Sequence, residues 1–189
     1  MPKTLDGAEI DATSVSKRPE ALDPDRVISM IPLRPYHIVA DIRCGSGHFS
    51  IPLAKYVSQG KLYAVDTTKE ATESCRQRLA KVHLENAEVI YSKAKKLPID
   101  KNSLDGAFLA FALHTIEDKA SLLAEAARLL QPGGWVAIIE WYKLSTEDGP
   151  ALENRVSEEE VRDLCKLAGL RFVSQRDLNG KSYLSLFRK

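Results

Sequence analysis

Two glycines and one carboxylate stand where the chain could hold a nucleoside. Gly45 and Gly47 follow the apolar run Ile38–Ile42. Glycines have no side chain, so a ligand can lie there against backbone amides at the start of a helix. Asp66 ends the next apolar run, where a carboxylate can accept two hydrogen bonds from a ribose diol. A packing turn and a helix cap would explain each feature alone, but together they favour a nucleoside site.

The elements around these residues read as strand, turn, helix and strand. Ile38–Ile42 predicts a strand, and the apolar residues from Phe49 to Val57 continue at helical spacing. Leu62–Val65 predicts the next strand. Thr67, with Glu70 three residues later, predicts a capping box that opens a helix reaching about Val82. A short helix is also expected before the first strand, because Asp23-Pro24 is a typical helix start.

The second half of the chain repeats this alternation and ends in a hairpin. Pro132-Gly133-Gly134 is expected to stop a helix, Ser157 to cap another, and Asn179-Gly180 to turn the final hairpin. The expected strands are Glu88–Tyr91, Asp105–Ala110, Val136–Trp141, Arg171–Asp177 and Ser182–Arg188, and the expected helices are Asp118–Leu130 and Ser157–Ala168. Strands that alternate with helices predict a mostly parallel sheet, with one antiparallel strand from the terminal hairpin.

Composition narrows the class of protein further. The 189 residues suffice for one such domain, expected over 23–189, with residues 1–22 as a flexible tail or lid. The 27 basic and 26 acidic residues leave a net charge of +1, which gives no reason to expect nucleic acid or a membrane as partner. Three widely spaced cysteines predict neither a disulfide framework nor a metal site. No apolar run has signal length, so we expect a cytoplasmic protein.

Four segments together resemble the successive motifs of class I S-adenosylmethionine (SAM)-dependent methyltransferases. They are Asp41–Gly47, Tyr63–Asp66, Lys96–Pro98 and Leu129–Gly134. Over about residues 23–189 the chain is similar to small methyltransferase-domain proteins related to ubiquinone and menaquinone biosynthesis methyltransferases. The resemblance implies a Rossmann-like, doubly wound, seven-stranded α/β sheet and SAM as cofactor.

The same resemblance implies roles for individual residues. Asp41, Gly45 and Gly47 would surround the methionine part of SAM, and Asp66, followed by Thr67, would hold the ribose. Lys93 and Ala94 would edge the adenine, and Phe111 to His114 would face the methyl group and the acceptor. The implied function is methyl transfer to a small, partly apolar acceptor, by a monomer or a homodimer.

Two residues depart from the family pattern. Arg43 replaces the first glycine of the loop, so we count it among the cofactor-binding residues and also as a cation that could obstruct them. Lys93 replaces an acid and offers only donors to the adenine amino group. The alternative function is therefore a catalytically inert binding or regulatory module with a degenerate cofactor site. A nicotinamide dehydrogenase is less favoured, because Ser50 stands where a third glycine is expected.

Other reactive side chains have two interpretations each. His114 is our candidate catalytic residue, as a general base, although a half-buried packing histidine fits the sequence equally well. Trp141 and Tyr142 could wall a substrate pocket, but a core position is favoured. Glu140 has no obvious partner, and Cys44 is expected to be a packed thiol.

Overall fold

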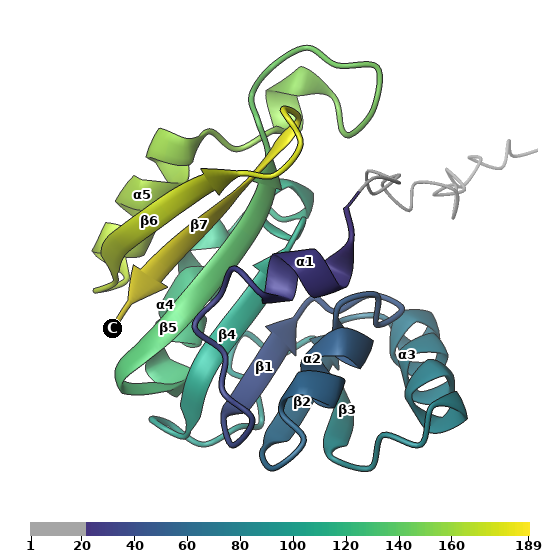
Figure 1. Cartoon of the computed structure of the whole chain (residues 1–189). Coiled ribbons are helices and arrows are strands. Elements are labelled where there is room, and N and C mark those ends of the chain that lie inside the picture. Colours follow the sequence, from purple (N-terminus) through teal and green to yellow (C-terminus); the bar gives the residue numbers. More distant parts are fainter. Residues whose placement is uncertain (1–21) are drawn as a thin grey trace, which may run out of the picture.

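A computed structural model describes residues 22–189 of the chain. The predicted tail or lid, residues 1–22, lies outside this range except for Leu22, which packs on the core. The described part is an α/β fold with seven strands and five α-helices (Figure 1). The strands are β1 (Ile38–Ile42), β2 (Lys61–Asp66), β3 (Ala87–Tyr91), β4 (Leu104–Ala110), β5 (Leu130–Trp141), β6 (Arg171–Asp177) and β7 (Ser182–Arg188). The helices are α1 (Pro24–Ile28), α2 (Ser50–Tyr56), α3 (Lys69–Lys81), α4 (Lys119–Leu129) and α5 (Glu158–Leu167), with 3₁₀ turns at Leu113–Thr115 and Leu152–Asn154.

The seven strands form one sheet in the order β3-β2-β1-β4-β5-β7-β6. All neighbouring pairs from β3 to β5 are parallel, whereas β7 runs antiparallel to both β5 and β6. The predicted doubly wound sheet with one antiparallel hairpin strand is therefore confirmed. The strand order reverses between β1 and β4, and this switch point is where open α/β sheets bind ligands.

Helices cover both faces of the sheet (Figure 1). On one face α1, α2 and α3 bury a core that includes Leu53 and Phe108. On the other face α4 and α5 bury a second core around Leu123 and Val161. The two cores pack against opposite faces of the central strands. Because these strands are held in place, the positions of the loops at the carboxyl ends of β1, β2 and β4 are fixed as well.

Local signals explain most of the element ends. Asp23 caps α1 by accepting from the Asp25 amide at 3.0 Å, and Ser157 caps α5 by accepting from the Glu160 amide at 3.2 Å. Both caps were predicted, and the bounds of β6 and β7 agree with the prediction residue for residue.

Two sequence predictions are wrong. Thr68, not Thr67, caps α3, because the Thr68 hydroxyl accepts from the Ala71 amide, whereas the Thr67 hydroxyl accepts from Arg43. In addition, β5 begins at Leu130 instead of Val136. Leu130 pairs with Leu104 of β4 before a register shift, so the strand runs through the Pro-Gly-Gly segment that was expected to separate helix from strand.

Candidate active site

The turn after β1 is built from three residues with left-handed backbone. Arg43, Gly45 and Gly47 have φ values of 66°, 56° and 82°. A Cβ on Gly47 would lie 2.7 Å from the Cys75 sulfur, so this position requires glycine for packing as well as for conformation. The Arg43 amide donates to the Val65 carbonyl at 2.8 Å, which ties the turn to the end of β2. The loop and Asp66 are therefore held side by side.

Asp66 points toward this turn. One carboxylate oxygen, Oδ2, accepts from the Gly45 amide at 2.9 Å. The other, Oδ1, accepts from the Thr67 and Thr68 amides at 2.7 and 3.1 Å and from the Thr68 hydroxyl at 3.2 Å. The residue is only 8% exposed. Because Oδ2 accepts one bond and Oδ1 three, Oδ2 keeps capacity for a hydroxyl of a ligand.

Asp41 is buried one strand away from Asp66. It accepts a 2.6 Å hydrogen bond from the Ser50 hydroxyl at the start of α2. This contact links the end of β1 to the helix that follows the glycine turn. Asp41 therefore contributes to the shape of the turn that was predicted to receive a ligand.

A cavity of about 190 Å³ opens beside Asp66 at the switch point. Its walls are mostly apolar, and Arg43, Asp66, Thr67 and Ala94 lie among its lining residues. Arg43 donates to the Thr67 hydroxyl across the cavity wall. Sequence reasoning did not single out the further lining residues Ile42, Val65, Ser92, Lys95, Leu97, Ile116, Asp118, Ser121 and Leu122. Of these, Ile42, Val65 and Leu97 stand in the quoted motifs, whereas Ile116 comes from the turn after β4 and Leu122 from α4.

Lys93 is exposed and is not one of the residues that line this cavity. Its neighbours Ser92 and Ala94 take that place. Lys95 also lines the cavity and pairs with Asp118 at 2.8 Å, with both side chains well exposed. The hydrogen bond from Lys95 lowers the pKa of Asp118 below its ordinary value, and the same bond raises the pKa of Lys95 above its own. Of the two residues that depart from the family pattern, Arg43 therefore lines the cavity and Lys93 does not.

The turn after β4 holds a buried histidine against a buried glutamate. Nδ1 of His114 lies 2.8 Å from Oε2 of Glu140, and the two side chains are 4% and 0% exposed. Oε1 of Glu140 accepts from the Leu113 amide at 2.7 Å. Nε2 of His114 is buried and has no hydrogen-bond partner among the described residues. An unmet buried polar atom costs about 1–3 kcal/mol, so this nitrogen is a candidate contact for a ligand.

Phe111 is a buried residue in the turn after β4 that contacts the end of β5. It has a φ of 55° and packs on Trp141, with ring centroids 5.5 Å apart. Trp141 is fully buried, as expected of a core residue, and its ring also faces the Arg155 guanidinium at 5.4 Å. Phe111 therefore lies where the turn after β4 meets the wall of the core.

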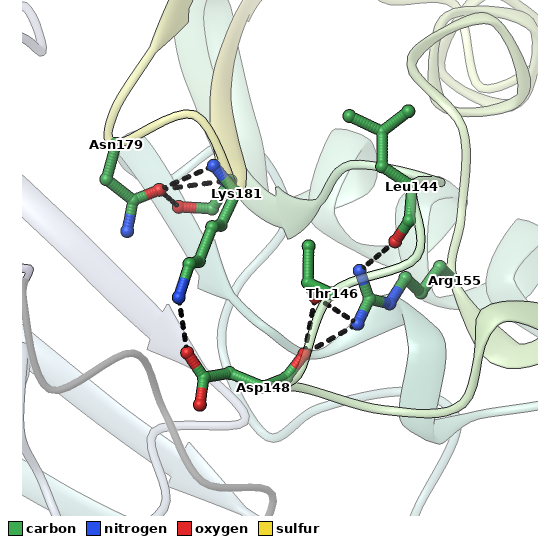
Figure 2. Close-up of polar contacts among 7 residues, drawn as sticks. Leu144, Thr146, Asp148, Arg155, Asn179 and Lys181 are labelled. Atoms are coloured by element: carbon green, nitrogen blue, oxygen red, sulfur yellow. Dashed lines mark hydrogen bonds and ion pairs between the residues drawn. The ribbon is translucent and has the colours of Figure 1, made fainter.

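A second cavity, of about 260 Å³, lies beyond His114. It shares Ile116 with the first cavity and is bordered by the segment that follows β5. Buried Arg155 organises this segment (Figure 2). Its guanidinium donates to the carbonyls of Tyr142, Leu144, Asp148 and Pro150 and to the Thr146 hydroxyl. Lys181, next to the Asn179 turn, pairs with Asp148 from the hairpin side.

Comparison with known proteins agrees with this geometry. Residues 40–138 match the model of a methyltransferase domain family. A solved SAM-dependent methyltransferase from Aquifex aeolicus is 30% identical, with a TM-score of 0.83 over 88% of this chain and 89% of that one. The chain belongs to the class I SAM-dependent methyltransferases.

Curated relatives indicate which members of this family the chain is similar to. Demethylmenaquinone methyltransferases from Oceanobacillus iheyensis and Staphylococcus epidermidis are 34% and 35% identical over 101 residues, which is 53% of this chain. Those alignments span 42% and 41% of the relatives, so the chain matches less than half the length of each. The methyltransferase is thus related to quinone biosynthesis enzymes over about half of its own length.

The cavity of this methyltransferase fits SAM. Ile42, Leu97 and Leu122 offer apolar surface for a purine ring, and the turned-in carboxylate of Asp66 offers an acceptor for a ribose hydroxyl. Two cations contact the glycine turn: Arg78 of α3, which donates to the carbonyl and hydroxyl of Ser46, and Arg43, which lines the cavity. Arg43 reaches the Thr67 hydroxyl instead of the loop amides, so it narrows the cavity without closing the turn.

The thiols of the methyltransferase are packed, as expected. Cys44, Cys75 and Cys165 are buried and free. Contact with Cys75, together with burial, holds the pKa of Cys44 well above its ordinary value. A protonated thiol is a poor nucleophile, so Cys44 is not suited to attack a substrate. Among residues 22–189, no group of three His, Cys, Asp or Glu side chains could hold a metal ion, and no helix is long and apolar enough to cross a membrane.

Proposed function

We propose that the protein transfers a methyl group from SAM to a small, partly apolar acceptor. The observation that carries this proposal is the Asp66 carboxylate, turned toward the glycine turn and lining a cavity at the switch point of the sheet. An enzyme of this class needs a preformed cradle for the nucleoside and a second space beside it for the acceptor. The two cavities, which share the lining residue Ile116, would provide both.

Each site residue has a place in the proposal. Asp41, Gly45 and Gly47 would surround the methionine part of SAM, Asp66 and Thr67 the ribose, and Ala94 the adenine. Phe111 and His114 would lie nearest the methyl group. SAM supplies a methyl group on a positively charged sulfur. The protein's contribution would be to align the acceptor with that group and to exclude water, because charge is dispersed in such a displacement.

The curated relatives support the class of acceptor. Their names specify methylation of demethylmenaquinone, a small molecule. Most residues that line the acceptor space here are polar or charged, and its apolar surface comes from Ile116 and Val156. A small aromatic acceptor with a polar reacting end therefore fits the proposal better than a macromolecule.

The proposal places the reaction in the cytoplasm. Three unpaired thiols in one chain are typical of proteins in a reducing compartment. The nearly balanced charge supports a small-molecule partner instead of nucleic acid or a membrane surface. Light scattering on the purified protein would distinguish a monomer from the homodimer that we also consider.

Calorimetry with SAM and S-adenosylhomocysteine tests the proposal. We expect both to bind at micromolar strength. Asp66→Ala should weaken binding by about 1–3 kcal/mol, the scale of a hydrogen bond to a charged group. Asp163→Ala, which removes an exposed carboxylate from α5, should leave the affinity unchanged. If the folded wild-type protein bound neither ligand, the result would contradict the proposal and support an inert module instead.

A further inference from the structure

We propose that Glu140 positions His114 as a proton acceptor, and that the methyl acceptor is therefore a molecule that loses a proton when it is methylated. The chemical class is a phenolic or enolic hydroxyl, or a ring carbon activated by one. A thioether or a tertiary amine would not need such a group. The substrate class rests on the proposed function, whereas the state of the imidazole rests on the geometry alone.

The contacts of Glu140 determine which nitrogen of His114 carries the proton. An ionised carboxylate only accepts hydrogen bonds. Oε1 accepts from the Leu113 amide at 2.7 Å, and Oε2 lies 2.8 Å from Nδ1 of His114. Nδ1 must therefore be the donor in this contact. A neutral imidazole that carries its proton on Nδ1 leaves Nε2 as a free acceptor.

Nε2 of His114 lies where a ligand could donate the hydrogen bond that this nitrogen lacks. Nε2 is buried and unpartnered among residues 22–189, although its ring is held rigidly by Glu140. Buried polar atoms in folded proteins almost always find a partner. His114 borders the second cavity, which shares the lining residue Ile116 with the cavity proposed for SAM. A hydroxyl of a bound acceptor would supply the missing hydrogen bond.

The step balances without any further reactant. Nε2 of His114 takes the proton of the acceptor's O–H bond. In methylation at oxygen, the electron pair left on oxygen forms the new bond to the methyl carbon. In methylation at a ring carbon, a π electron pair of the ring forms that bond, and the ring C–H proton is then lost while the oxygen regains a proton, so one proton leaves in either case. The sulfur–methyl bond breaks, and its electron pair stays on sulfur, which becomes neutral. The imidazolium, paired with the Glu140 carboxylate, then releases its proton to solvent. One proton and one methyl group are exchanged, and no oxidation takes place.

Charged groups around the cavity set the environment of this proton transfer. Glu140 faces the imidazole directly from β5. The other charged residues that border the same cavity come from the turn after β4, from α4, from the segment after β5 and from α5, and they are Glu117, Lys119, Lys143, Glu153, Arg155 and Glu160. Apart from Glu140, these residues are three cations and three anions.

The first test measures the imidazole itself, with SAM absent. Nitrogen-15 NMR at neutral pH should show His114, one of four histidines, with its proton on Nδ1. Glu140→Gln keeps an oxygen for the Leu113 amide and turns an amide NH₂ toward Nδ1, so the proton should move to Nε2. Glu125→Gln, at another buried glutamate, should leave His114 unchanged. A proton on Nε2 in the wild-type protein would overturn the proposal.

The second test measures methylation of phenols, thioethers and tertiary amines of comparable size by mass spectrometry. We expect product from a phenol such as 1,4-naphthalenediol. Glu140→Gln should lower kcat for it by about 10- to 100-fold, a part of the effect of a general base. SAM affinity measured by calorimetry should stay within about twofold. Methylation of thioethers or tertiary amines alone, an unchanged kcat in Glu140→Gln, or no phenolic product from a protein that binds SAM would overturn the proposal. Failure to bind SAM would instead refute the proposed function.

Discussion

Replacing Arg43 by glycine separates two effects of this residue. Its φ of 66° lies in the left-handed region, which costs a residue with a Cβ about 1–2 kcal/mol. Glycine removes that strain but loses about 0.5–1 kcal/mol of chain entropy. The bond to the Thr67 hydroxyl, worth about 0.5–1.5 kcal/mol, is also lost. The stability of Arg43→Gly should therefore stay within about 1 kcal/mol of the wild-type value.

The effect of Arg43→Gly on SAM affinity should be larger than its effect on stability. The arginine lines the cavity, so a ligand that occupies the ribose position must first displace it from Thr67. Relief of that cost, about 0.5–1.5 kcal/mol, corresponds to binding about 2- to 13-fold tighter. Calorimetry with SAM measures this gain.

Arg43→Ala is the matched control. Alanine removes the guanidinium but keeps the Cβ, so it should share the gain in affinity and be about 1 kcal/mol less stable than the glycine variant in urea denaturation. Equal stability of the alanine and glycine variants would contradict the strain argument. Weaker SAM binding in both would show that Arg43 is a ligand and not an obstruction.

Three further changes test the packing around the site. Gly47→Ala should lower the free energy of unfolding by about 2 kcal/mol or more, measured in urea, because its Cβ would meet the Cys75 sulfur at 2.7 Å on a left-handed backbone. Arg155→Lys should speed proteolytic cleavage within residues 143–154 several-fold, because an ammonium cannot span the acceptors that the guanidinium holds. Unchanged cleavage would mean that the segment is ordered by other contacts. Burial raises the pKa of Cys165 to about 12 from an ordinary 9.0, so its thiol favours the folded state below pH 9, and that contribution is lost as the pH rises toward 12. Cys165→Ala should therefore show a flatter decline in stability over this window than the wild-type protein, and equal slopes would contradict the assignment.

Local chemistry made the ends of several elements predictable. The Asn179-Gly180 turn defined β6 and β7, and single caps at Asp23 and Ser157 defined the starts of α1 and α5. The start of β5 was not predictable, because Leu130 is a strand residue only through its pairing with Leu104. The proline and two glycines that follow Leu130 predicted a turn, and no local signal in the sequence indicated the pairing with Leu104.

The part of the site proposed for the nucleoside could be predicted from the sequence, whereas the part around His114 and Glu140 could be predicted less well. Asp66 and the glycine turn lie close in the chain and on neighbouring strands, so spacing alone brought them together. The partner of Glu140 could not be seen, because β4 and β5 bring His114 to it across a sheet. The left-handed backbone of Arg43 was equally hidden, since its side chain gives no local signal for it.

A crystal structure with S-adenosylhomocysteine tests the central claim most directly. The account predicts the nucleoside in the cavity at the switch point, with a ribose hydroxyl hydrogen-bonded to Oδ2 of Asp66 and the amino-acid part along Gly45 and Gly47. A ligand bound elsewhere, or one in this cavity whose ribose makes no contact with Asp66, would contradict it.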